Sequence, residues 1–122
     1  MLDVRPSPIA GTWYEGNKET LARVVDNFLN NAQLPALDGE VIGVIAPHAG
    51  HQYSGAVAGY AFAVIKELKP DLVAVISPFH NYSNHPLLTT AHDAYGTPLG
   101  RIEVDKSAMA ELSSHLDIPI TP

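Results

Sequence analysis

The sequence has no cysteine, few charged residues and no cluster of basic residues. Without cysteine, the chain can form neither disulfides nor a thiolate nucleophile. Charged residues make up 16% of the chain, against roughly 25% in an average soluble domain. This shortage predicts that part of the surface is covered by a partner or by further chain. The formal charge is -6, and nucleic-acid binding, which needs concentrated positive charge, is not expected.

Long apolar runs are also missing. No run reaches the roughly 18 residues that a membrane span needs, so no membrane partner is expected. The N-terminus lacks the charged-then-apolar pattern of a signal peptide, which predicts a cytoplasmic location. With 122 residues, 46% of them apolar, the chain is long enough for one domain with its own core.

Hydrophobic periodicity predicts a mixed α/β chain. Apolar residues from Leu21 to Leu29 recur at helical spacing and predict a helix over 18–32, with Asn17 as its N-cap. The segment 1–16 contains two prolines and predicts irregular structure before that helix.

The centre of the sequence predicts a βαβ unit. Two short apolar runs, 41–46 and 72–77, are typical of strands buried on both faces of a sheet. Between them, the small-residue segment 54–68 predicts a helix capped by Ser54. A strand, a helix and a strand in this order imply two parallel strands with a right-handed crossover.

The last third of the chain predicts shorter elements. Residues 86–95 and 101–104 are expected to be strands joined by a turn at 96–100. Asp105 is the expected cap of a helix over 106–116. The final segment, DIPITP, is not expected to complete a helix or a strand.

Two histidines follow the two strands of the predicted βαβ unit. His48 lies two residues beyond the first strand, and His80 lies three beyond the second. Parallel strands end at the same edge of a sheet, where α/β proteins bind ligands. Each histidine also follows a proline, which stiffens the turn that carries it. Imidazoles bind Fe, Cu and Zn, so this spacing predicts a metal-ligand pair without choosing the metal.

Five further residues are close enough in sequence to line the same cleft. His51 and Asn81 are candidate catalytic residues, and Tyr53, Tyr82 and His85 are candidate substrate-binding residues. For each of them, a packing or purely structural role remains open at this point.

The segments AGTWYEG, IAPHAG, YSGAVAGYAF, SPFH and YGTPLG occur in this order over nearly the whole chain. Together they resemble the N-terminal part of the Memo family. The resemblance implies the α/β fold of class III extradiol ring-cleaving dioxygenases, a mostly parallel, βαβ-based sheet flanked by helices. In that fold two histidines and a third residue hold non-haem iron. The resemblance implies that His48 and His80 are ligands, and it favours iron or copper over zinc.

The chain departs from the usual family motifs beside both expected ligands. His51 stands where the family usually has tyrosine, and SPFHN carries Phe79 and Asn81 where PSHH has serine and a second histidine. Family members are also much longer. The resemblance therefore implies that residues 1–122 form one Memo-like domain, the N-terminal portion of a longer fold, and that the third ligand comes later.

Three functions remain open, and with them the question of whether the chain is an enzyme. The first is a metal-dependent protein with dioxygenase-like redox chemistry. The second is a non-catalytic module that binds a peptide or a small molecule in the histidine cleft. The altered SPFHN motif and the signalling roles for which eukaryotic family members are named favour this one. The third is an incomplete half-domain whose apolar face is covered by self-association or by a partner chain.

Overall fold

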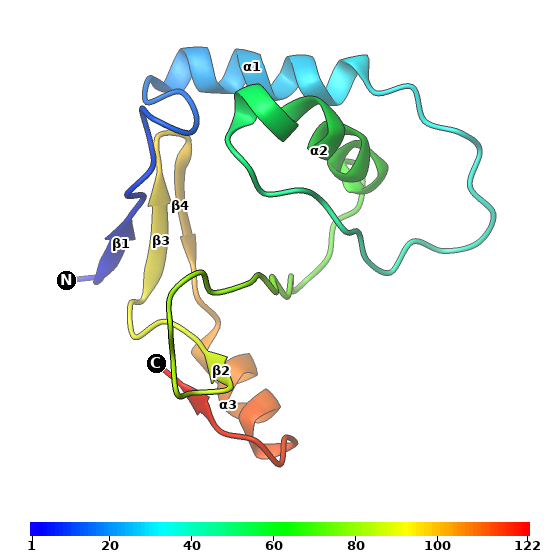
Figure 1. The fold of residues 1–122 in the computed structure, drawn as a ribbon. Coiled ribbons are helices and arrows are strands. Elements are labelled where there is room, and N and C mark those ends of the chain that lie inside the picture. Colours follow the sequence, from blue (N-terminus) through cyan, green and yellow to red (C-terminus); the bar gives the residue numbers. More distant parts are fainter. The chain divides into compact units, whose positions relative to one another are not determined.

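The computed structural model describes all residues, 1–122, as two units. The first, here called the helical unit, is Pro8–Asp71 and contains α1 and α2. The second, here called the sheet unit, combines Met1–Ser7 with Leu72–Pro122 and contains five short strands and α3 (Figure 1). The predicted mixed α/β class with mostly parallel strand pairing is confirmed. No helix combines the length and the apolarity that crossing a bilayer requires.

The first helix of the helical unit, α1 (Lys18–Asn31), forms as predicted. The Asn17 side chain accepts a hydrogen bond from the Thr20 N–H at 2.9 Å, which confirms the predicted N-cap. Leu21, the first residue of the apolar stripe, is the most buried side chain of this unit, with 3% of its surface exposed.

The second helix, α2 (His51–Ile65), begins one turn earlier than predicted. Its N-cap is Gly50 rather than Ser54, whose hydroxyl instead donates to a backbone carbonyl five residues earlier. The carbonyl of Trp13 accepts the N–H of His51 at 2.8 Å. A backbone carbonyl from a distant loop therefore satisfies the first N–H of α2. The sequence had predicted that the Ser54 hydroxyl would cap this helix.

The two helices pack through Phe28 of α1 and two glycines of α2. A Cβ atom at Gly59 would lie 2.7 Å from the carbonyl oxygen of Phe28, and one at Gly55 would collide with the Phe28 ring. Both glycines are buried. Figure 1 shows α1 and α2 next to each other. Any larger residue at either position would separate them.

The sheet unit contains a three-stranded sheet. β1 (Val4–Pro6) pairs in parallel with β3 (Ala94–Thr97), which forms an antiparallel hairpin with β4 (Gly100–Glu103). The hairpin confirms the predicted turn. Ala94 in β3 is fully buried.

The remaining elements of the sheet unit are small. β2 (Leu87–Leu88) pairs in parallel with β5 (Ile120–Thr121). The third helix, α3 (Lys106–Ser114), is capped as predicted, because the carboxylate of Asp105 accepts the N–H of Ala108 at 2.9 Å. This bond and the Ser107 hydroxyl lower the pKa of Asp105 below its usual value.

The strands predicted at 41–46 and 72–77 do not form. Both segments are irregular, and their isoleucines are almost fully exposed: Ile45 is 99% exposed and Ile76 is 94% exposed. A strand that is apolar on both faces needs a neighbouring strand and a cover for each face. The five strands of this structure pair only among themselves. The prediction of a βαβ unit around α2 is therefore wrong for this structure.

Three smaller predictions also need correction. The expected strand over 86–95 is split into β2 and β3 by a bend. β1 and β5 lie in segments that were predicted to be irregular. Each consists of two or three residues and includes or borders a proline, so no periodic pattern marked it.

A cluster of charged groups ties β1 to the start of β3. The carboxylate of Asp93 accepts the N–H of Asp3 at 2.9 Å and forms an ion pair with Lys106. The carboxylate of Asp3 lies 3.0 Å from Nδ1 of His92. The Lys106 ammonium, followed by the Asp3 N–H, lowers the pKa of Asp93 below its usual value.

We expect Gly59→Ala to destabilise the chain by up to about 2 kcal/mol, because the new methyl group meets the backbone of Phe28. The overpacking cost of about 1–3 kcal/mol is offset in part by a helix-propensity gain of about 1 kcal/mol. Urea denaturation measures the difference. Gly43→Ala is the matched control, since a Cβ there would meet nothing within 4 Å. Equal stability of Gly59→Ala and the parent would contradict the packing.

A second prediction concerns acid stability. The pKa of Asp93 is lower in the folded chain, so its ionised form stabilises the fold above the unfolded pKa of about 3.9. That contribution is lost as the pH falls through the folded-state pKa. Asp93→Asn should therefore lower the urea midpoint at pH 7, and its difference from the parent should shrink below about pH 4. Asp26→Asn, on an exposed position of α1, controls for the loss of one charge.

Candidate functional site

The two predicted metal ligands lie in different units. His48 precedes α2 in the helical unit, and His80 lies in the irregular segment that leads to β2 in the sheet unit. Both residues are exposed. The pairing of the two histidines as metal ligands stays a prediction. Neither unit gathers three or more His, Asp or Glu side chains in an arrangement that could hold a metal ion.

The turn that carries His48 is anchored to another sequence motif. Gly50 is buried against Trp13, where a Cβ atom would lie 3.2 Å from the Trp13 carbonyl oxygen. The same carbonyl accepts the N–H of His51. AGTWYEG and IAPHAG, which are about 35 residues apart in the sequence, are therefore in direct contact, and the turn that contains His48 is fixed at its C-terminal end.

His51 is packed among aromatic rings. Its ring centroid lies 5.5 Å from that of Tyr14 and 5.8 Å from that of Phe28, the latter edge to face. Its Nδ1 atom is buried and forms no hydrogen bond. These contacts give His51 a packing role, and its catalytic role stays a prediction. Within the AGTWYEG motif, the ring of Tyr14 and the backbone carbonyl of Trp13 contact this histidine.

Two of the other predicted site residues of the sheet unit, Tyr82 and His85, have local partners. The Tyr82 hydroxyl donates to Oδ1 of Asn84 at 2.7 Å. Nδ1 of His85 lies 3.2 Å from the hydroxyl of Thr121, which ties the segment before β2 to β5. Asn81 is exposed. The roles of these residues in binding stay predictions.

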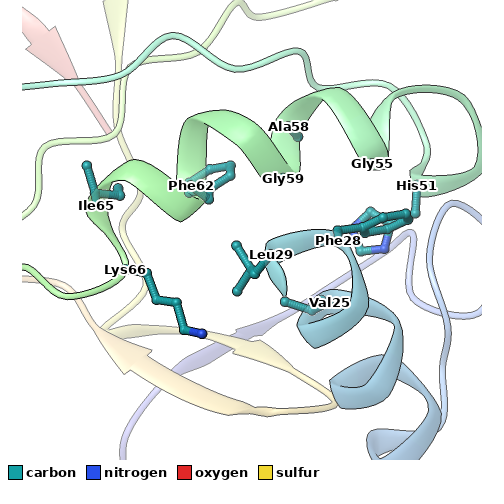
Figure 2. Close-up of a pocket in the computed structure, with 10 residues that line it drawn as sticks. All are labelled: Val25, Phe28, Leu29, His51, Gly55, Ala58, Gly59, Phe62, Ile65 and Lys66. Atoms are coloured by element: carbon teal, nitrogen blue, oxygen red, sulfur yellow. The ribbon is translucent and has the colours of Figure 1, made fainter. Parts of the chain in front are cut away.

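The cavities of the helical unit lie beside α2. One, of about 420 Å³, is a groove between α1 and α2. Figure 2 shows Phe28 and His51 at one end of this groove and Lys66 at the other. Its remaining lining residues are apolar or glycine: Val25, Leu29, Gly55, Ala58, Gly59, Phe62 and Ile65. A second cavity, of about 250 Å³, lies where Trp13 and Tyr14 meet His51 and Gln52. His48 lines neither.

Tyr53 lies outside both cavities. Its side chain is 79% exposed on α2, and it lines neither of the two cavities. The structure thus brings His51 to two cavities of the helical unit but does not bring Tyr53 to them. A substrate contact by Tyr53 stays a prediction.

Known proteins resemble this chain along most of its length. The sequence profile of the family described as Memo-like protein matches residues 5–121. A MEMO1 family protein of Pyrobaculum aerophilum is 34% identical over 121 residues, which cover 93% of this chain and 43% of that protein. The protein memo-1 homolog of Caenorhabditis elegans is 34% identical over 116 residues, 93% of this chain and 33% of the relative. The chain spans less than half the length of these relatives.

The aromatic contacts of His51 predict a stability effect. His51→Ala should destabilise the chain by roughly 1–3 kcal/mol, because it leaves a gap between Tyr14 and Phe28. His51→Phe should retain or raise stability, since it keeps a ring and removes the buried nitrogen that lacks a hydrogen bond. Gln52→Ala, a neighbouring exposed position on α2, is the control. Thermal and urea unfolding measure all three, and a neutral His51→Ala would refute the packing role.

Proposed function

The chain belongs to the Memo-like protein family, and on that premise we propose that it binds a transition metal, iron or copper, through His48 and His80. The observation that carries the proposal is the anchored turn before α2. The Trp13 carbonyl and the buried Gly50 fix the backbone next to His48. A ligand presented from a fixed backbone loses little conformational entropy when it binds a metal. For His80 the support is its place in the family motif.

The chemistry of the donors suits these metals. Neutral imidazole nitrogen is a good ligand for Fe(II), copper and zinc. A facial triad of the dioxygenase type, however, needs a third protein ligand and open positions for oxygen and substrate. Two histidines alone should bind with modest affinity. Dioxygenase-like redox chemistry is therefore a more specific proposal than metal binding, and it requires a third metal ligand.

A non-catalytic binding function is the second candidate. It is favoured by the residues beside the ligands: Phe79 and Asn81 replace two groups that could transfer protons, and His51 is packed against Tyr14 and Phe28. In this case the metal would hold a peptide or a small molecule without turnover. Oxygen consumption with catechols separates the two functions, because only the first predicts it.

Calorimetric titration of the purified chain with Fe(II) or Cu(II) tests the metal site. Even outer partners of metal ligands are worth about 10–100-fold in affinity. His48→Ala and His80→Ala should therefore each weaken binding at least about tenfold. Because the metal displaces protons from its ligands, binding should also weaken toward acid pH.

His115→Ala is the matched control for the titration. His115 is an exposed histidine at the C-terminal cap of α3, where its Nδ1 lies 2.8 Å from the carbonyl oxygen of Glu111. Its replacement should leave metal affinity unchanged. Unchanged binding in both the His48 and His80 variants, or an equal loss in the His115 variant, would reject the proposed ligands.

A further inference from the structure

The side chain of Ser54 holds the turn before α2 rather than the end of the helix. A hydroxyl that caps a helix accepts a backbone N–H, whereas the Ser54 hydroxyl donates to the carbonyl oxygen of Ala49 at 3.1 Å. Ala49 directly follows His48. The bond therefore fixes the peptide group between Ala49 and Gly50, one residue beyond the proposed metal ligand.

The next peptide group of this turn is held as well, by a different partner. The N–H of His51 donates to the carbonyl oxygen of Trp13 at 2.8 Å. A Cβ atom at Gly50 would lie 3.2 Å from the same oxygen, so the missing side chain is what allows this close approach. Two consecutive peptide groups on the C-terminal side of His48 are therefore fixed, one by a side chain of α2 and one by a distant backbone carbonyl.

The Trp13 carbonyl is a firm point of attachment because it belongs to a turn closed by its own hydrogen bonds. The N–H groups of Thr12 and Trp13 donate to the carbonyl oxygen of Ile9 at 3.2 and 3.0 Å, and the Thr12 hydroxyl donates to it at 2.9 Å. The N–H of Gly11 donates to the carbonyl oxygen of Tyr14 at 2.8 Å. Of the two anchors, one therefore belongs to a preformed turn, whereas the other depends on a single side-chain hydroxyl.

The backbone of His48 is also limited on its N-terminal side. The residue before it is Pro47, whose ring fixes the φ angle of the proline at about −65°. With a proline on one side and two fixed peptide groups on the other, the backbone of His48 has little freedom. An imidazole on such a backbone binds a metal without first losing many conformations, which favours binding.

We propose that Ser54 is a positioning residue of the metal site, which holds His48 in the orientation for ligation through the carbonyl of Ala49. This inference rests on the proposed function, because it takes His48 to be a ligand. Ser54 itself neither binds the metal nor exchanges a proton with it. Its hydroxyl restricts the rotation of one peptide group, and without it the turn is held by Trp13 alone.

Replacing Ser54 tests this role in the 122-residue chain. Ser54→Ala should raise the Kd for Cu(II) about three- to tenfold, the effect of losing one ordinary hydrogen bond. Ser54→Thr keeps a hydroxyl at the same atom and should restore most of the affinity. Calorimetric titration measures each Kd, and circular dichroism confirms that the helices are retained. The electron paramagnetic resonance spectrum of bound Cu(II) should also broaden in Ser54→Ala, because His48 then adopts more than one orientation.

Ser114→Ala is the matched control. The Ser114 hydroxyl donates to the carbonyl oxygen of Glu111 at 2.7 Å, near the end of α3. The change therefore removes the same kind of bond, from a serine to a backbone carbonyl, at a helix that does not carry the His48 turn. It should leave the Kd for Cu(II) and the spectrum unchanged. An equal loss in Ser114→Ala and Ser54→Ala would show a general effect on stability and overturn the proposal.

A double-mutant cycle shows whether Ser54 acts through His48. In a His48→Ala background, Ser54→Ala should cause no further loss of affinity, since the residue that it positions is gone. An additive loss would mean that Ser54 acts by another route and would overturn this inference. Unchanged binding in Ser54→Ala beside a loss in His48→Ala would overturn this inference but leave the proposed ligands standing. No loss in His48→Ala would reject the proposed ligand, and the positioning role with it.

Discussion

The contact between Phe28 and the glycines of α2 is the constraint on which the helical unit depends. It exists because two positions one turn apart carry no side chain, so the backbone of one helix meets a ring and a carbonyl of the other. The same contact determines which side of α2 is covered and which is exposed. It also positions the first residue of α2 against the Phe28 ring, and the turn that carries His48 immediately precedes that residue.

Local signals in the sequence were sufficient for the elements that are stabilised locally. Asn17 and Asp105 were recognised as caps because one side-chain oxygen and one nearby N–H decide the start of a helix. The start of α2 was misplaced because its first N–H is satisfied by Trp13, a contact that no local pattern reveals. The runs at 41–46 and 72–77 have the composition of buried strands, but a strand depends on neighbours that sequence alone does not supply.

The candidate site was predictable only in part, for the same reason. The positions of His48 and His80 follow from motif and spacing, whereas their mutual distance depends on how distant segments assemble. His51 was identified as a polar residue of a cleft, and the structure shows its ring between Tyr14 and Phe28. The signal that could have indicated this was the aromatic pair in AGTWYEG, which is otherwise unexplained in a loop.

The sheet unit consists of two segments that are far apart in the sequence, Met1–Ser7 and Leu72–Pro122. This separation affects the order in which the chain can fold during synthesis. β1 precedes the whole helical unit in the sequence, yet its partner, β3, ends at Thr97. All of the helical unit leaves the ribosome between them. Parallel pairing over so long an interval carries a large loop-closure cost. The helical unit, which is one continuous segment, can therefore form first, while β1 stays unpaired until β3 has been translated.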